Sequence, residues 1–557
     1  MSTVKLYGLG GLDENGKNLY CLEFENRIFV IDCGIKRQDA AQFGVDFVIP
    51  DFSYLIDNAD KVAAVIITHV HDDMMDAVPY LINKVNVPVY ANAAAAFSLK
   101  KKLDQQGIKG YKIVELPRYG EVNCEGVKVT TFGLTHFTPS AIGVAIETPD
   151  GQVVIAEQYI IDFDMREDEY NCDLGVIAEI GKKGVLCAMI ESTYADVEGF
   201  TAPRHRITPL IRPVIEDAQG RIIITAYSQS FFRLKEIISL ASEFKKKIFF
   251  YDKSVREILE SGVEEGYFKL NKNLYLSEKD FRNNIEDCII VVSGNGAQTF
   301  AAMHKIAINE DDTIELRDTD NIIIASPVVS GSEKEASAME NELYKDNVHI
   351  TKLDKKSVLS MHPAVEDIKM MLYLLKPKYF LPVMGLYKDF ISAANIAVSA
   401  GFTPDKIIIL DNGQIATLKD GKLVSCSEMI EQIGERNING EDNKNVTSQV
   451  LKDREALSTD GVIVIGIAVD YNTKEIIGGP DIQSRGVVYV KDSEYLIKNC
   501  SKMVVDQINE MVANGTYKNL ECRVELKEKI SRYVFRETGK KPMILPAIIE
   551  INLPAGY

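Results

Sequence analysis

The chain has 557 residues, which suggests about three or four globular domains. Asp and Glu total 81 against 63 Lys and Arg, so the net charge of −18 disfavours binding to nucleic acid or anionic membranes through bulk charge. Any contact with RNA or DNA must therefore come from a local groove.

Three features of the sequence bear on the protein's cellular location and on the redox state of its cysteines. The longest apolar runs, such as Val62–Ile67 and Val462–Val469, are too short to cross a bilayer. Met1–Tyr7 lacks the basic and then apolar pattern of a signal peptide. The nine cysteines are scattered without a C-x-x-C motif, which is typical of reduced core thiols. We expect a cytoplasmic protein with no membrane partner, no disulfide framework and no cysteine zinc site.

Residues 1–204 contain short β-branched runs separated by turns and helical stretches. The clearest runs are Ile28–Ile31, Val62–Thr68, Val127–Thr131 and Val153–Ile155. Alternation of short strands with helical segments predicts a layered α/β domain with sheets flanked by helices.

A second α/β pattern follows in residues 205–365. Its strand-like segments are Arg221–Thr225, Lys247–Tyr251, Cys288–Val292 and Asn321–Ala325, and Arg233–Phe244 is amphipathic. Strands that alternate with helices predict a parallel sheet, so this segment is interpreted as an inserted domain.

The rest of the chain is less uniform. Tyr379–Val383 and Lys406–Leu410 are strand-like, and periodicity alone leaves open which of the two domains they join. Residues 427–460 are polar and charged, as in a linker, and residues 461–557 predict another compact α/β unit. This last unit has 13 basic against 12 acidic residues, so it is not a basic nucleic-acid arm.

Two histidines stand directly after an apolar run. A strand that ends in His69-Val-His71 places both imidazoles on one side, where they can converge on one ion with Asp73 close behind. The alternative is two ordinary loop histidines. His136 also follows a strand-like run, and taken alone it is more typical of a structural loop histidine.

The order of short motifs along the chain resembles that of the metallo-β-lactamase-fold nucleases with a β-CASP insertion, and within them the bacterial ribonuclease J family. The motifs are Leu9–Asn18, Ile31–Ile35, Val48–Asp51, Thr68–Asp76, Val78–Leu81, Ile190–Thr193, Ser293–Gly296, Val329–Lys334, Lys376–Val383, Ile409–Gly413, Ser484–Gly486 and Lys541–Pro546. They cover nearly the whole chain, in the family's order.

The resemblance implies an α/β fold made of a metallo-β-lactamase αββα sandwich, an inserted β-CASP parallel-sheet α/β domain, a linker and a small C-terminal α/β domain. The implied bounds are 1–204 and 366–426 for the lactamase domain, 205–365 for the β-CASP domain, 427–460 for the linker and 461–557 for a C-terminal oligomerisation domain.

The sequence departs from the family at the expected metal ligands. Met74 stands where the last histidine of H-x-H-x-D-H belongs, Gln158 replaces the aspartate that bridges two metals, and Met384 replaces the final histidine. A thioether is a poor ligand for a hard divalent ion. The surviving ligands implied by the resemblance are His69, His71, Asp73 and His136. We therefore expect at most one divalent metal, zinc or manganese, and loss of the second metal site.

Nearby acids offer an alternative source of a bridging carboxylate. Glu157, Asp162 and Asp164 flank or follow the substituted position, and each is equally consistent with a solvated loop.

The implied substrate-binding residues also show a mixed pattern. Ser360 and His362 match the family's H-V-S-G-H motif, whereas Val358 replaces its first histidine and Phe232 replaces another. The family's glycine-rich phosphate loop matches a segment whose implied binding residues are Gly294, Asn295 and Gly296. His362 and Asp73 are then the remaining catalytic candidates. The alternatives are a structural histidine before Pro363 and an ordinary Gly-Asn-Gly turn.

The resemblance implies a ribonuclease J paralogue in RNA processing and decay, including mRNA turnover and rRNA maturation, most like the second, catalytically degenerate paralogue. It implies weak or no nuclease activity alone, and a structural or regulatory role in a hetero-oligomer with an active ribonuclease J. A homodimer and other RNA-decay proteins are further implied partners, with RNA as the ligand. Two alternatives stay open: a low-activity metal-dependent 5′-3′ exoribonuclease or endoribonuclease with one metal, and a one-metal hydrolase for a small substrate.

Overall fold

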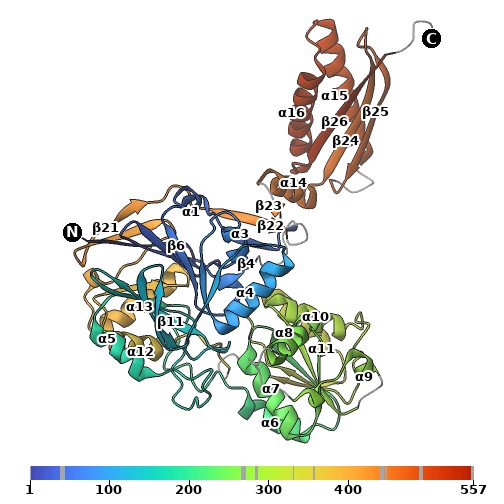
Figure 1. Cartoon of the computed structure of the whole chain (residues 1–557). Helices are drawn as coiled ribbons and strands as arrows, with labels where there is room; N and C mark the ends of the chain where they lie inside the picture. Colours follow the sequence, from blue (N-terminus) through green and yellow to red (C-terminus); the bar gives the residue numbers. More distant parts are fainter. Residues whose placement is uncertain are drawn as a thin grey trace. The chain divides into compact units, whose positions relative to one another are not determined.

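The computed structural model describes residues 2–37, 44–264, 271–282, 286–329, 331–354, 358–439, 444–445, 448–487 and 493–552 (Figure 1). The chain divides into two compact units. One runs to Ile438, and the other consists of Asn439–Tyr557 with Phe43–Val45.

The first unit contains an eight-stranded sheet with the order β21-β20-β1-β2-β3-β6-β7-β8. Strand β1 lies inside this sheet because it pairs with β2 on one side and with β20, near residue 416, on the other. The strands are β1 (Thr3–Gly10), β2 (Leu19–Phe24), β3 (Arg27–Ile31), β6 (Val62–Ile67), β7 (Val89–Asn92), β8 (Ile113–Leu116), β20 (Gln414–Lys419) and β21 (Lys422–Met429).

A second sheet of six strands faces the first, with the order β19-β13-β12-β11-β10-β9. Strand β19 pairs in parallel with β13, so the chain returns to this sheet after the inserted domain. The strands are β9 (Gly120–Cys124), β10 (Val127–Gly133), β11 (Ile142–Thr148), β12 (Gly151–Ala156), β13 (Val185–Glu191) and β19 (Tyr379–Val383).

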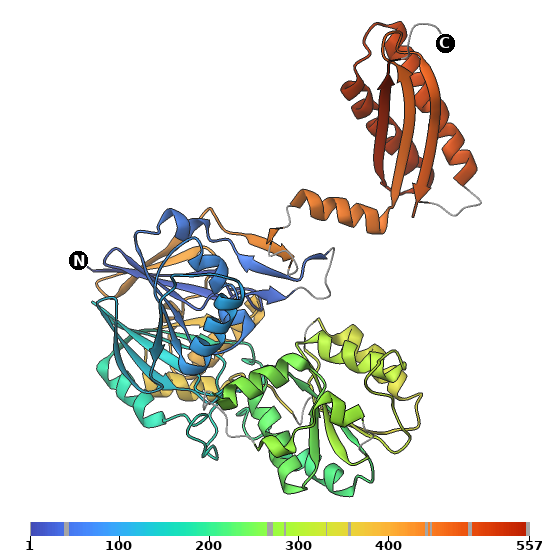
Figure 2. The ribbon, with the colours of Figure 1, turned by 45° about the vertical axis from the view of Figure 1, so that its right-hand side comes forward.

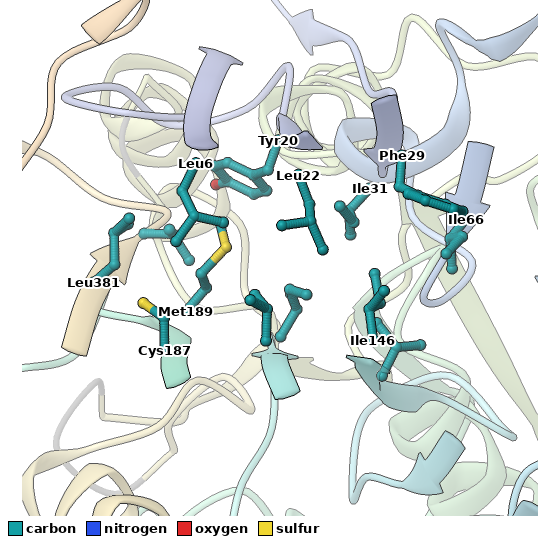
Figure 3. Close-up of a cluster of buried hydrophobic side chains, with 14 of the residues drawn as sticks. Leu6, Tyr20, Leu22, Phe29, Ile31, Ile66, Ile146, Cys187, Met189 and Leu381 are labelled. Atoms are coloured by element: carbon teal, nitrogen blue, oxygen red, sulfur yellow. The ribbon is translucent and has the colours of Figure 1, made fainter. Parts of the chain in front are cut away.

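An apolar core fills the space between the two sheets (Figure 3). Leu22 and Ile31 reach into it from the first sheet, and Ile146 and Met189 reach into it from the second. Strands with apolar residues on both faces are covered on both sides. The outer faces accordingly carry helices: α4 (Ala93–Gln105) packs on the first sheet, and α5 (Leu174–Lys183), α12 (Val365–Leu375) and α13 (Tyr387–Ser399) pack on the second. The result is the predicted αββα sandwich.

The inserted domain lies between β13 and β19 and has a five-stranded, all-parallel sheet with the order β15-β16-β14-β17-β18. Apolar clusters cover both faces of this sheet, as expected for parallel strands. Its strands are β14 (Ile222–Tyr227), β15 (Lys247–Phe250), β16 (Cys288–Gly294), β17 (Asn321–Ile324) and β18 (His349–Lys352). Its helices are α6 (Thr208–Asp217), α7 (Phe231–Glu243), α8 (Lys253–Glu264), α9 (Glu278–Arg282), α10 (Ala297–Ala307) and α11 (Glu333–Leu343).

One carboxylate joins both connections between the sandwich and the inserted domain. Asp367, fully buried in α12, accepts a hydrogen bond from the backbone N–H of Ile161 at 2.7 Å, of Thr201 at 2.9 Å and of Ala364 at 3.0 Å. Thr201 precedes α6, the first helix of the inserted domain, and Ala364 follows β18, its last strand, so this side chain holds the entry and the exit of that domain together.

The second unit is a three-stranded sheet with two long helices (Figure 2). Strand β24 lies in the centre, antiparallel to β25 and parallel to β26, and alternate side chains of β24 pack against the helices. Its elements are α14 (Ser448–Thr459), β24 (Val462–Asp470), β25 (Ile476–Arg485), α15 (Ser493–Ala513), α16 (Asn519–Thr538) and β26 (Met543–Ile551).

The structure corrects one predicted strand and shows regular elements inside the predicted linker. Lys406–Leu410 is not a strand: Pro404–Lys406 is a 3-10 turn, and Ile407 forms a single bridge to Phe380 before the chain turns into β20. The predicted linker contains β22 (Glu435–Asn439), which pairs with β5 (Phe47–Pro50), and the helix α14. The predicted domain boundaries themselves stay predictions. In the described part of the chain, no helix has the length and apolar character of a membrane span.

Candidate metal centre

Three histidines meet at one end of the sandwich. His69 and His71 follow β6 in the first sheet, whereas His136 follows β10 in the second sheet. The imidazole ring centroids lie 4.5 Å apart for His69 and His136 and 4.8 Å apart for His71 and His136. One nitrogen of each ring lies within 4.8 Å of the others, so the three side chains are close enough to share an ion. The structure thus brings together the three predicted metal histidines.

The side chain of Gln158 lies at the centre of this cluster. Its Oε1 is 3.0 Å from Nε2 of His69 and 3.0 Å from Nε2 of His136. Its Nε2 donates to Asp73 Oδ2 at 3.2 Å and lies 3.8 Å from the sulfur of Met384. A neutral carboxamide therefore contacts both the predicted three-histidine site and the remains of the second subsite.

The remaining predicted ligand, Asp73, lies at the start of the short helix α2 (Asp72–Met75). Its Oδ2 also accepts a hydrogen bond from Asn18 at 3.2 Å, and its Oδ1 lies 3.8 Å from Nδ1 of His71. Met74 and Met384 are both buried and belong to the apolar core between the sheets. Two thioethers thus take the places of two expected imidazoles.

Buried carboxyl groups lie beneath the histidines. Burial raises the pKa of Asp32 to about 6, although Thr68 donates hydrogen bonds to it through its backbone N–H and its hydroxyl. Burial also raises the pKa of Glu157 well above its usual range, and the neighbouring Asp32 and Glu191 raise it further. Glu157 is 1% exposed, so it is not the solvated loop residue that the sequence left open.

The other two acids considered as displaced carboxylates do not take that place. Asp162 lies 3.3 Å from Nε2 of His205 and accepts a hydrogen bond from Arg206 at 2.6 Å. Asp164 is exposed. Among the described residues, neither acid hydrogen-bonds a member of the three-histidine cluster.

We expect the substitution Glu157→Gln to stabilise the protein at neutral and alkaline pH. Because the carboxyl pKa of Glu157 is higher in the folded than in the unfolded chain, the folded state binds the extra proton, and stability falls as pH rises through the raised pKa. An isosteric amide removes this penalty. Urea denaturation at about pH 8 should show a gain of at least about 1 kcal/mol, the value of one pKa unit, and a smaller gain at about pH 5.

The exposed Glu179 on α5 offers the matched control Glu179→Gln. We expect a change within about 0.5 kcal/mol for this surface site at either pH. Equal effects of Glu157→Gln at both pH values would contradict the prediction.

The predicted catalytic histidine His362 is held by a carboxylate. Its Nδ1 lies 2.6 Å from Oε1 of Glu191, a fully buried residue at the end of β13. Oε2 of the same glutamate accepts a hydrogen bond from the backbone N–H of Gln158 at 2.6 Å. A carboxylate that fixes one ring nitrogen orients the other, which is the arrangement of a general acid or base. Ser360 is also buried, two residues before His362.

The predicted phosphate loop lies between β16 and the N-terminus of α10. Gly296, with φ of +51°, precedes the first residue of this 11-residue helix. A Cβ on Gly294 would lie 2.9 Å from the backbone nitrogen of Thr299, so the close turn requires glycine there. Backbone N–H groups at such a turn favour anions.

A cavity of about 210 Å³ extends from the histidine cluster to this loop. Its lining includes His71 and Asn295, the basic residues Arg37, Lys101 and Lys102, and the acids Asp72 and Asp76, which form ion pairs with Arg37 and Lys102. Ser228 hydrogen-bonds Asn295 across its wall. The lining therefore has three basic against two acidic side chains, together with hydroxyl and amide groups.

The chain matches three family models. These are the metallo-beta-lactamase superfamily over residues 12–156, the ribonuclease J beta-CASP domain over residues 219–343 and the ribonuclease J C-terminal domain over residues 449–551. Among curated relatives, Ribonuclease J2 of Bacillus subtilis is 30% identical over 550 residues, covering 98% of this chain and 99% of that protein. The chain belongs to the ribonuclease J family. Ribonuclease J 1 of Streptococcus pyogenes serotype M3 is 29% identical over 549 residues, covering 98% of this chain and 97% of that protein.

A solved structure supports the fold of this ribonuclease J family member. A protein of unknown function from Enterococcus faecalis V583 superposes with a TM-score of 0.51 at 14% identity, covering 75% of this chain and all of that one. Together with the family models, this confirms the predicted metallo-β-lactamase sandwich, β-CASP insertion and C-terminal domain.

The ribonuclease J fold and the histidine cluster suggest a metal site. The ligand atoms present determine whether one or two metal ions fit there. Three imidazoles suffice for one zinc ion with an open position. The second subsite retains the Asp73 carboxylate, with a carboxamide and a thioether beside it. Since these neutral groups bring no charge to hold a second cation, the residues do not fit a two-metal centre.

Sequence reasoning missed two residues of the site and the position of a third side chain. Glu191 lies in a motif that carried the resemblance, yet only the structure places it against His362. Asn18, which bonds Asp73, lies in another such motif. The position of the Gln158 side chain had no sequence signal, because its four contacts come from three segments that are far apart in the chain.

Proposed function

We propose that this chain is a subunit of the RNA processing and decay machinery that binds RNA and acts beside an active ribonuclease J in a hetero-oligomer. It has weak or no nuclease activity of its own. The observation that carries this proposal is the Gln158 carboxamide, which lies between the two halves of the site where the family resemblance implies a bridging carboxylate.

The second subsite limits the chemistry that this chain can perform. Two metal ions together stabilise the attacking and the leaving oxygen of a phosphodiester displacement. The groups around Asp73 do not fit a second cation, so that stabilisation is missing. His362, oriented by Glu191, retains the geometry to hold or transfer a proton near a bound phosphate, but proton transfer alone is a small part of the barrier.

RNA binding is supported by groups away from the histidines. The glycine loop at Gly294–Gly296 precedes α10, and the cavity beside it is lined by three basic and two acidic residues, with Lys101 among the basic ones. Contacts with phosphate and sugar position a nucleic acid without any need for cleavage. A chain that keeps these groups and lacks a two-metal set suits an RNA-binding role within a larger enzyme.

The purified chain tests this proposal on a 5′-monophosphorylated RNA with added manganese. We expect decay no faster than that of the His69→Ala/His71→Ala variant, together with measurable RNA binding by fluorescence anisotropy and copurification with an active ribonuclease J. Metal-dependent decay that this double variant abolishes would contradict the subunit role.

A charge reversal tests the RNA-binding cavity. Lys101→Glu should weaken RNA binding at least about tenfold, since it removes a positive charge near the phosphates and adds a negative one. The matched control is Lys182→Glu, an exposed lysine on α5 outside the cavity, which should leave affinity nearly unchanged. Equal losses in both variants would show that bulk charge, not the cavity, governs binding.

One observation favours a second candidate function. The three converging imidazoles match the ligand set of a single catalytic zinc, which supports a low-activity metal-dependent 5′-3′ exoribonuclease or endoribonuclease. In that case the manganese assay above gives slow decay that requires His69 and His71.

A further inference from the structure

We propose that the Gln158 carboxamide is a built-in replacement for the metal, which closes the three-histidine pocket and holds its two halves together. This inference deepens the proposed function, because it names what keeps the site inactive. It concerns metal binding by the chain itself and does not depend on RNA.

The Gln158 carboxamide lies buried between two of the three histidines. Gln158 is 2% exposed, and its Oε1 lies 3.0 Å from the Nε2 atoms of both His69 and His136. The oxygen thus occupies the position in front of the two ring atoms that would otherwise bind an ion in the first subsite. Buried polar groups without partners are costly, so the amide makes the pocket stable without metal.

His136 directs a proton at this carboxamide. The backbone N–H of Thr138 donates to Nδ1 at 3.2 Å, which leaves the proton of the neutral ring on Nε2, pointing at Gln158. A metal ligand needs a free lone pair on that nitrogen. An incoming ion must therefore displace the amide oxygen and move this proton.

The other end of the amide faces the second subsite. Its Nε2 donates to Asp73 Oδ2 at 3.2 Å and lies 3.8 Å from the Met384 sulfur. One neutral group thus joins the first subsite to the remains of the second. The contacts need a side chain of this length, since the backbone of Gln158 is tied separately to Glu191.

The backbone at this position supplies the best test variant. Gln158 has φ of +47°, a left-handed conformation that glycine adopts without strain and that asparagine tolerates. Gln158→Gly removes the amide and relieves the backbone. Gln158→Asn keeps an amide on a side chain one methylene shorter, so it reaches fewer of the partners.

The experiment is a cobalt titration of the full-length chain, followed through the visible absorption of tetrahedral Co²⁺. We expect the wild type to bind weakly and Gln158→Gly to bind about one ion per chain at least about tenfold more tightly. Adding His136→Ala to Gln158→Gly should abolish the gain. If Gln158→Gly does not fold, as judged by circular dichroism, Gln158→Asn is titrated instead, and tighter binding than wild type is expected there.

Weaker or unchanged cobalt binding by Gln158→Gly would overturn the proposal. If the amide oxygen is itself a metal ligand, removing it weakens cobalt binding, and equal binding by wild type and variant would show that the amide does not compete. Tight cobalt binding by a wild type without nuclease activity would refute the amide replacement and leave the subunit role intact. RNA decay that persists without metal would refute the subunit role and leave the amide replacement intact.

Discussion

Restoring the three missing ligands together, with Met74→His, Gln158→Asp and Met384→His, is expected to raise the rate of 5′-monophosphorylated RNA decay by about 10²- to 10⁴-fold. The bridging carboxylate would supply the charge between the two subsites that the Gln158 amide lacks. Two metal ions stabilise charge in the transition state by several kcal/mol, and each 1.4 kcal/mol is about tenfold in rate.

The measurement combines metal content by elemental analysis with decay rates in manganese. Gln158→Asp alone is the informative partial variant, because it restores the bridge and leaves both thioethers in place. The triple variant carrying His69→Ala and His71→Ala in addition should lose the gain. A triple variant that binds two metals without faster decay would place the defect outside the metal ligands, with Phe232 and Val358, which replace two of the family's histidines, as the next positions to restore.

Replacing Asp367 by alanine is expected to destabilise the first unit by about 3 to 5 kcal/mol. The carboxylate accepts three backbone N–H groups, from Ile161, Thr201 and Ala364. Each of these buried donors would be left without an acceptor, at about 1–3 kcal/mol each. We expect a large loss of stability because both connections to the inserted domain depend on this one side chain.

Urea denaturation of the full chain measures this loss. Glu366→Ala is the matched control, since Glu366 is the neighbouring acid on α12 and bonds only the side chain of Lys369 among its recorded contacts. We expect a change within about 0.5 kcal/mol for the control, as for other surface sites. A loss of similar size for the two variants would show that helix charge, not the shared acceptor, matters at this position.

Much of the fold follows from local patterns and motif order. The β-branched runs at Ile28–Ile31 and Val62–Thr68 are strands within a residue or two of their predicted ends, because they carry apolar side chains on both faces of a covered sheet. The segment Lys406–Leu410 has the same local pattern and is not a strand. The segment does not form a strand because it contacts β19 at a single bridge and the chain must then turn into β20.

The site was predictable to the level of residue types. The H-x-H spacing brings His69 and His71 together, and the resemblance adds His136. Sequence spacing does not show which groups the substituted side chain of Gln158 contacts. That a glutamine would bond two imidazoles, a carboxylate and a thioether depends on contacts between both sheets, which no local pattern specifies. The same holds for Glu191 and His362, which are 171 residues apart in the sequence.

The pairing of β1 with β20 also determines the order in which the chain can fold during synthesis. Leu6 pairs with Ala416, so the partner of the first strand leaves the ribosome about 400 residues later, roughly 20 to 80 seconds at typical elongation rates. The inserted domain, whose five strands lie between residues 222 and 352, is complete before the sandwich that surrounds it. A transcript cut short before β20 therefore yields a nascent chain with an unpaired edge at β1, which is a template for aggregation.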